Sequence, residues 1–249
     1  MANRRLLLLA LLLAACSTPV EETPVEPVRL VVTPEAAHLV GAMTQGIRAD
    51  IQTAPLAEAV AAVESGEADL LITFALPPEG WFATPLALDG FAVITHDDVA
   101  VQAVSMEELE ALYSGTTANW DALGGGEESV QVFAPFPGDA LRLWLEEVRG
   151  WSNPAPTAVL VPSPQAAIEA VAETPGGIII VPYSALADGA DVLRVDGIRP
   201  GSSTFENGRY PLTVEVLAMA PTEPEGHVRA WLVDLQTVPA TETPVPVEE

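Results

Sequence analysis

The sequence predicts an α/β protein. Between about residue 28 and residue 237, short apolar runs alternate with segments whose apolar residues recur at helical spacing. This alternation is typical of sheets covered by helices. The chain has 249 residues, enough for one medium domain or two small lobes. No internal repeat interrupts the pattern.

Four strands and two helices are predicted in the first part of the folded body. Thr33 and Pro34 follow the first strand and are typical of a helix N-cap and a first helical position. The second helix carries Leu56, Val60 and Val63 on one face. The predicted strands are residues 29–32, 49–53, 68–74 and 88–95.

Helix starts are the clearest signals in the second part of the body. Ser105 and Glu108 have the spacing of a capping box. Asp139 precedes a helix that extends to Val148, and Ser163 and Pro164 begin another. A last helix is predicted at residues 227–235. The predicted strands are residues 130–134, 157–161, 177–181, 192–195 and 212–219.

The N-terminus has the pattern of an export signal. Arg4 and Arg5 precede a leucine-rich run that is too short to span a bilayer comfortably. The run ends in Leu13-Ala14-Ala15-Cys16, which resembles the bacterial lipobox, in which the cysteine is acylated. We therefore expect a signal peptide at residues 1–15 and an extracytoplasmic protein anchored to the cell membrane through lipidated Cys16. The alternatives are a soluble secreted protein and a leader kept as an anchor helix.

Two terminal segments have a Thr/Pro/Glu/Val composition that cannot bury a core. Residues 16–27 are interpreted as a flexible stalk and residues 238–249 as a disordered tail. The stalk would hold the folded body about 30 Å from the bilayer, at roughly 3 Å per residue.

Charge and composition exclude several classes of function. After residue 15 the chain has 8 arginines against 35 acids, a formal charge of −27, and it has no lysine. Nucleic acid is therefore excluded as a partner, because phosphate backbones need clustered positive charge. Cys16 is the lone cysteine, and His38 and His96 are isolated, so no metal site and no cofactor are predicted. No nucleophile elbow or acid/base dyad suggests an enzyme.

Four motifs, in one order along most of the body, resemble the phosphate-type solute-binding proteins of ABC importers. Residues 104–125 are similar to that family's helix followed by "SG…NW…LGG". The other three are Ser65-Gly-Glu-Ala-Asp69, Thr174-Pro-Gly-Gly-Ile178 and the pair Asp196-Gly-Ile-Arg-Pro200 and Gly208-Arg-Tyr-Pro-Leu212.

The resemblance implies the two-lobed type II periplasmic-binding-protein fold with two interlobe crossings. One lobe would comprise residues 28–95 and 183–237, and the other residues 96–182. It further implies a monomer that binds a small-molecule ligand, with phosphate as the family default, and delivers it to an ABC permease. Ligands in such folds lie at the carboxyl ends of strands and at helix N-termini.

The family's phosphate loop is altered in this chain. The motif "R…SGT…F" aligns with Ala134 at the arginine and with Gly138, Asp139 and Ala140 at the Ser-Gly-Thr positions. Arg142, one turn into the helix, is the candidate replacement for the missing arginine. Further candidate ligand contacts are Thr33, Thr53 and Thr73, which follow strands, and Tyr183 at the second crossing.

Three functions remain open from the sequence. The first is a lipid-anchored binding protein for phosphate or a related oxyanion, with a degenerate anion site. The second is a degenerate binding fold that acts as an envelope interaction or sensor module, with Phe136 or Trp81 filling the cleft. The third is a binding protein for a neutral or cationic organic solute, which fits the acidic composition.

Overall fold

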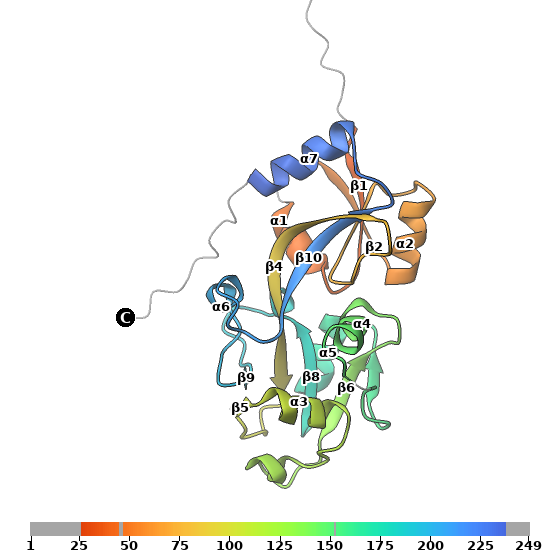
Figure 1. The fold of residues 1–249 in the computed structure, drawn as a ribbon. Coiled ribbons are helices and arrows are strands. Elements are labelled where there is room, and N and C mark those ends of the chain that lie inside the picture. The colour runs from red at the N-terminus through yellow and green to blue at the C-terminus, as the bar shows by residue number, and fades with distance from the viewer. Residues whose placement is uncertain (1–25, 45–46, 152, 238–249) are drawn as a thin grey trace, which may run out of the picture.

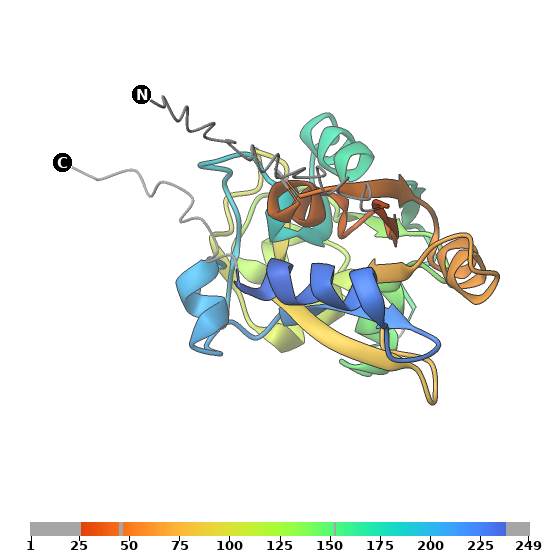
Figure 2. The same cartoon turned by 90° about the horizontal axis from the view of Figure 1, so that it is seen from above.

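A computed structural model describes residues 26–44, 47–151 and 153–237, and it confirms the α/β class. The described chain forms two lobes, one above the other in Figure 1 and viewed from above in Figure 2. One continuous series of strands joins them, in the order β2-β1-β3-β10-β4-β8-β6-β7. A separate pair, β5 (Ala103–Val104) and β9 (Arg194–Val195), lies beside the lower lobe.

Lobe 1 contains the N-terminal strands and the C-terminal helix. Three parallel strands at its edge are followed by the antiparallel β10. Helix α2 packs on one face of this sheet, and α1 and α7 pack on the other. The elements are β1 (Val28–Val32), α1 (Ala37–Met43), β2 (Ala49–Thr53), α2 (Leu56–Glu64), β3 (Leu70–Thr73), β10 (Thr213–Ala220) and α7 (Gly226–Thr237).

Lobe 2 is a smaller sheet between helices. Strands β6, β7 and β8 are parallel, so their carboxyl ends meet at one edge. Helix α5 packs on one face, and α3 and α4 pack on the other. The elements are α3 (Met106–Tyr113), η1 (Trp120–Leu123), β6 (Gln131–Pro135), α4 (Ala140–Glu147), β7 (Val159–Val161), α5 (Pro164–Ala172) and β8 (Gly177–Pro182).

Strand β4 (Phe82–Thr95) belongs to both lobes. Residues 82–90 pair with β10, and residues 91–95 pair with β8. At the change of partner, a side chain on Gly90 would lie 2.3 Å from the ring of Phe205, which is in α6 (Ser202–Glu206). A glycine is therefore required for this close approach. The lobe boundaries expected at residues 95 and 183 remain predictions.

A buried carboxyl group lies next to this crossing. Asp89 accepts a hydrogen bond from the Gly90 amide at 2.7 Å and a longer one from the amide of Ser184, in η2 (Tyr183–Ala185). Burial raises the pKa of Asp89. Nearby, the Tyr210 hydroxyl donates to the Phe91 carbonyl at 2.8 Å. These contacts connect the two segments that run between the lobes.

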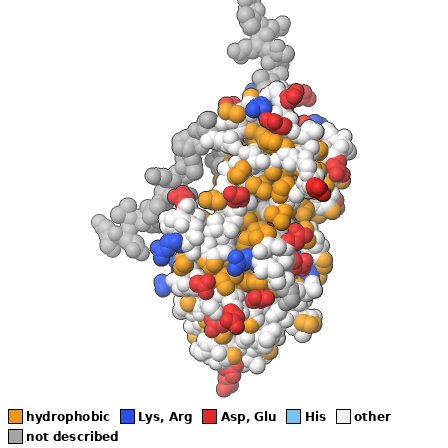
Figure 3. Space-filling model, viewed as in Figure 1, with side chains coloured by type: hydrophobic (Ala, Val, Ile, Leu, Met, Phe, Trp, Pro, Cys, Tyr) orange, Lys and Arg blue, Asp and Glu red, His pale blue; other side chains and the backbone are white. Residues whose placement is uncertain are grey.

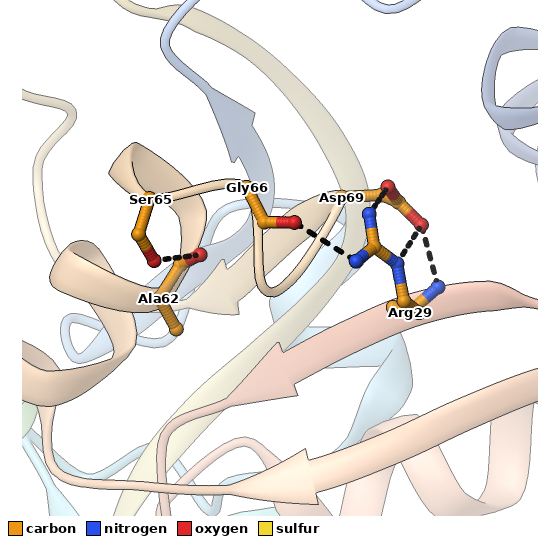
Figure 4. Close-up of polar contacts among 5 residues, drawn as sticks. All are labelled: Arg29, Ala62, Ser65, Gly66 and Asp69. Atoms are coloured by element: carbon orange, nitrogen blue, oxygen red, sulfur yellow. Dashed lines mark hydrogen bonds and ion pairs between the residues drawn. The ribbon is translucent and has the colours of Figure 1, made fainter.

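An ion pair at the outer end of lobe 1 joins β1 to the turn before β3. The Arg29 guanidinium contacts both carboxylate oxygens of Asp69 and donates to the Gly66 carbonyl at 2.8 Å (Figure 4). Hydrogen bonding to Asp69 raises the pKa of Arg29. The predicted turn at residues 65–69 is thus held to the first strand, although an exposed pair of this kind adds at most about 1 kcal/mol to stability.

The predicted helix start at Thr33 is wrong. The Thr33 amide donates to the Ile72 carbonyl, so the strand pairing continues through this residue. A turn at residues 34–36 follows, and α1 begins only at Ala37 with no side-chain cap. The capping box at Ser105 and the caps by Asp139 and Ser163 are confirmed.

Several strands differ in extent from their predictions. The predicted strand at 88–95 begins at Phe82, and the predicted strand at 192–195 shortens to residues 194–195. The strands predicted at 68–74 and 157–161 shorten to residues 70–73 and 159–161. The expected signal peptide, the acylated Cys16, most of the stalk and the tail lie outside the described residues. Among the residues that are described, no helix is long and apolar enough to cross a membrane.

Candidate functional site

A pocket lies where lobe 1 meets the carboxyl ends of the lobe 2 strands. Its walls include Pro135 at the end of β6, Val161 at the end of β7 and Val181 at the end of β8. Ser163, at the start of α5, also contributes. Lobe 1 adds Glu35 from the turn before α1. This is the edge at which open α/β sheets bind ligands.

Glu35 is the buried acid of this pocket. Glu35 is only 2% exposed, and apart from Asp139 no described residue donates a hydrogen bond to its carboxylate oxygens. The displaced helix start explains its position, because the turn at residues 34–36 places Glu35 between the end of β1 and lobe 2. A charged carboxylate in such a place is costly unless something pairs with it.

Asp139 faces Glu35 from lobe 2. It is the N-cap of α4, and its Oδ1 accepts from the Leu141 amide at 3.1 Å. Gly138 precedes it with a φ of +85°, which turns the chain from β6 into the helix. The predicted capping role of Asp139 is therefore confirmed, while Gly138 is exposed and Ala140 is buried.

The two carboxyl groups cannot both be charged without a high cost. Burial, followed by the nearby carboxyl of Glu35, raises the pKa of Asp139 to about 9. At neutral pH the Asp139 carboxyl therefore keeps its proton, which it can donate to Glu35. No other described group donates a hydrogen bond to the Glu35 oxygens.

The predicted threonine contacts lie at different distances from this pair. Thr33 and Thr73 are buried at the carboxyl ends of β1 and β3, and the Thr33 hydroxyl donates to the Thr73 hydroxyl at 3.2 Å. Thr73 also accepts from the Ala75 amide. Thr53, by contrast, is exposed at the end of edge strand β2. A ligand role for each of the three remains a prediction.

Arg142 is held within lobe 2. Its guanidinium contacts Glu146 and Asn153, each at 2.9 Å, and it approaches the Pro135 carbonyl at 3.5 Å. In the part of the chain that the structure describes, no arginine lines the pocket. The ring of Tyr183 packs edge to face on Phe205, with centroids 5.4 Å apart. The structure thus brings together Asp139 and Glu35, and it holds the Arg142 guanidinium on other partners.

Glu35 is the site residue that the candidate ligand contacts did not include. Its sequence position predicted an acid in the first turn of a helix, where it would complement the helix dipole. The available signal was the Pro34-Glu35 pair directly after a buried strand, at the edge where ligands bind. Within the described ranges, no group of three or more His, Cys, Asp or Glu side chains could hold a metal ion.

Exposed apolar side chains follow two of the strands that end near the lobe junction. Leu76, after β3, is 55% exposed, and Phe136, after β6, is 49% exposed. Figure 3 shows hydrophobic side chains extending across the junction of the lobes, with acidic side chains beside them. Neither Phe136 nor Trp81, the two residues considered as a plug of the cleft, lines this pocket.

Comparisons with known proteins consistently match this chain to solute-binding proteins. A family model described as a PBP superfamily domain matches residues 54–234. The phosphate-binding protein PstS of Bacillus subtilis (strain 168) is 28% identical over 158 residues, which cover 61% of this chain and 51% of that protein. The chain therefore spans about half the length of this curated relative.

Solved structures share the fold at low sequence identity. A phosphate ABC transporter substrate-binding protein from Clostridium perfringens, with bound phosphate, has a TM-score of 0.76 at 16% identity, covering 84% of this chain and 92% of that chain. An ABC-type phosphate transport receptor from Vibrio cholerae has a TM-score of 0.70 at 17% identity, covering 86% and 94%. The CcmR regulatory domain of Synechocystis, in complex with 2-PG, has a TM-score of 0.59 at 16% identity, covering 88% and 99%.

Proposed function

Because the chain belongs to the PBP superfamily and has its two-lobed type II fold, we propose that it captures a small solute between its lobes for an ABC importer. The observation that carries this proposal is the meeting of both lobes in one pocket at the carboxyl ends of the strands. Two lobes joined by extended crossings can close around a ligand.

The proposed setting is the outer face of the cell membrane. The leucine-rich leader and the Leu-Ala-Ala-Cys motif support export and acylation at Cys16, and the Pro-rich stalk supports a tethered monomer near its permease. Several acyl chains anchor a protein stably, whereas one does not. A binding protein held in this way releases its solute close to the transporter.

Phosphate or a related oxyanion is the first solute class to consider. Relatives of this chain are described as phosphate-binding, and Thr33 and Thr73 offer hydroxyl groups near the lobe junction. The pocket itself opposes an anion, because the charge of Glu35 and Asp139 lies where the family's arginine and hydroxyls would act. We therefore propose a degenerate anion site with weak phosphate affinity.

The alternative is an interaction or sensor module without a tight small ligand. Its supporting observation is Glu35, a side chain of this protein that itself reaches into the cleft. The CcmR domain shows that a regulatory protein can use this fold. A module of this kind would show no solute-dependent change in stability.

A thermal-shift screen separates the two functions. The screen compares anions, sugars, amino acids and amines, and a true solute at one hundred times its Kd is expected to raise the melting midpoint by about 5 to 10 °C. The shift should be lost in Ala167→Phe, which fills the pocket wall, and kept in Ala187→Phe on an exposed loop. Circular dichroism confirms that both variants fold.

The outcome of the screen is decisive for the proposal. A saturable shift with one solute class, sensitive to Ala167→Phe alone, supports solute capture. If no class of solute shifts the melting midpoint of the wild-type protein, or if Ala167→Phe responds as the wild-type protein does, the proposal of solute capture in this pocket is wrong.

A further inference from the structure

Two carboxyl groups from opposite lobes face each other in a pocket with little else that is polar. Glu35 comes from lobe 1, and Asp139 comes from the start of α4 in lobe 2. The remaining walls are mainly aliphatic and include Leu141, Val161 and Ile179. The enclosed part of this pocket is small, about 20 Å³, so it offers two acceptors to the polar head of a ligand and an apolar surface beside them.

The oxygens of Glu35 indicate which chemical group a ligand must have. Apart from the proton of Asp139, no described donor reaches the buried oxygens of Glu35. Leaving a buried acceptor without a hydrogen bond costs about 1–3 kcal/mol of stability, and more for a charged group. In a protein whose cleft binds a solute, the simplest partner is a solute group that donates hydrogen bonds and has positive charge.

The basic groups of the protein do not provide this partner. Arg142, the arginine of α4, is bound to Glu146 and Asn153 and is not among the residues that line the pocket. The net charge of −27 after the leader further favours the approach of cations over anions. The acidic side chains on the face in Figure 3 are consistent with this field.

We infer that Glu35 and Asp139 form a subsite for a primary ammonium group, so that the captured solute is a small organic amine with an aliphatic body. This inference rests on the proposed function, because it assumes that the interlobe pocket binds the solute. The ammonium group lies between the two carboxylates and donates to Glu35 and Asp139. Its aliphatic body contacts the lobe 2 wall.

A proton leaves when the ammonium group binds. Before binding, Asp139 holds its proton; afterwards its carboxylate is charged and faces the cation. The proton passes to solvent, and the solute remains protonated because its own pKa resembles that of lysine, about 10.4. The positive charge of the solute thus replaces the proton of Asp139, and the net charge of the pocket does not change.

The probe for this subsite is 1-propylammonium chloride, titrated calorimetrically into the wild-type chain at pH 8. Binding at one site is expected. The affinity should fall at least about thirtyfold in Glu35→Gln, because the ammonium group then lacks one of its two carboxylate partners. The matched control is Glu107→Gln, an exposed acid in the first turn of α3, which should bind as the wild-type protein does. The neutral analogue 1-propanol should not bind measurably.

Three results would overturn the inference. Equal affinity in Glu35→Gln and the wild-type protein places the ammonium group elsewhere, and equal affinity for 1-propanol shows that charge is not recognised. Phosphate binding to the wild-type chain without any 1-propylammonium binding overturns the inference alone. If no solute of any class binds, the proposed function fails as well.

Discussion

Removing both carboxyl groups is expected to strengthen phosphate binding by about a hundredfold. In the double variant Glu35→Gln/Asp139→Asn, the pocket keeps its shape and loses its negative charge. Like charges placed together cost several kcal/mol, and each 1.4 kcal/mol corresponds to a factor of ten. The amide groups can also donate to phosphate oxygens, which carboxylates cannot do.

The measurement is isothermal titration with phosphate at pH 8 and fixed ionic strength, since salt screens the general field of the protein. The control is Glu107→Gln, which removes one exposed acid in lobe 2, because Asp139 is mostly protonated at pH 8 and its substitution removes little charge. Equal phosphate affinity in this control and in the double variant would show that the pocket carboxyls do not oppose the anion.

The second large effect concerns stability. Trp120→Ala is expected to destabilise the protein by about 3–5 kcal/mol, which corresponds to a fall in melting midpoint of about 10 °C. Trp120 is completely buried in the core of lobe 2, and its indole Nε1 donates to the Gly176 carbonyl at 3.0 Å. The substitution removes a large apolar contact and one of the two hydrogen bonds that the Gly176 carbonyl accepts, the other being from the Gln131 amide.

This tryptophan matters for the pocket because Gly176 directly precedes β8, whose far end forms a pocket wall. Trp120→Phe retains most of the buried ring and loses the hydrogen bond, so it should cost only about 1–3 kcal/mol. Urea unfolding measures both variants. A free energy of unfolding for Trp120→Ala within 1 kcal/mol of the wild-type value would contradict this role.

Much of the fold was predictable because local signals are strong in this chain. The spacing of Ser105 and Glu108 predicts a capping box, and both of its hydrogen bonds form. The β-branched run at residues 177–181 predicts a buried strand, and β8 is buried throughout. Such signals depend on neighbouring residues, so they remain valid without knowledge of the tertiary structure.

The errors came from long-range contacts. Thr33 has the pattern of a helix cap, yet its amide donates to the carbonyl of Ile72, which is 39 residues further along the chain, and the helix starts later. The first half of β4 was missed because Phe82, Pro85 and Leu86 do not alternate regularly, while pairing with β10 holds residues 82–90 in a strand. A tertiary partner outweighs local propensity in both places.

The site was predictable only in part. Asp139 was identified because an acid before an amphipathic helix is a cap wherever that helix lies. Its pairing with Glu35 could not be deduced, since the two residues lie in different lobes and meet only through the chain crossings. Likewise, the sequence places Arg142 near the cleft, but Glu146 and Asn153 determine where its guanidinium points.

Proton release on binding tests most directly whether the Glu35 and Asp139 pair determines the solute class. The pKa of Asp139 is raised to about 9 in the free protein, and a cation within a few ångströms lowers a carboxyl pKa by about 1–3 units. Titration of 1-propylammonium at pH 8, in two buffers of different ionisation enthalpy without primary amines, measures the protons released. We expect release of about half a proton or more per solute bound in the wild-type chain and none in Asp139→Asn. Binding to the wild-type chain with no proton release would contradict the account.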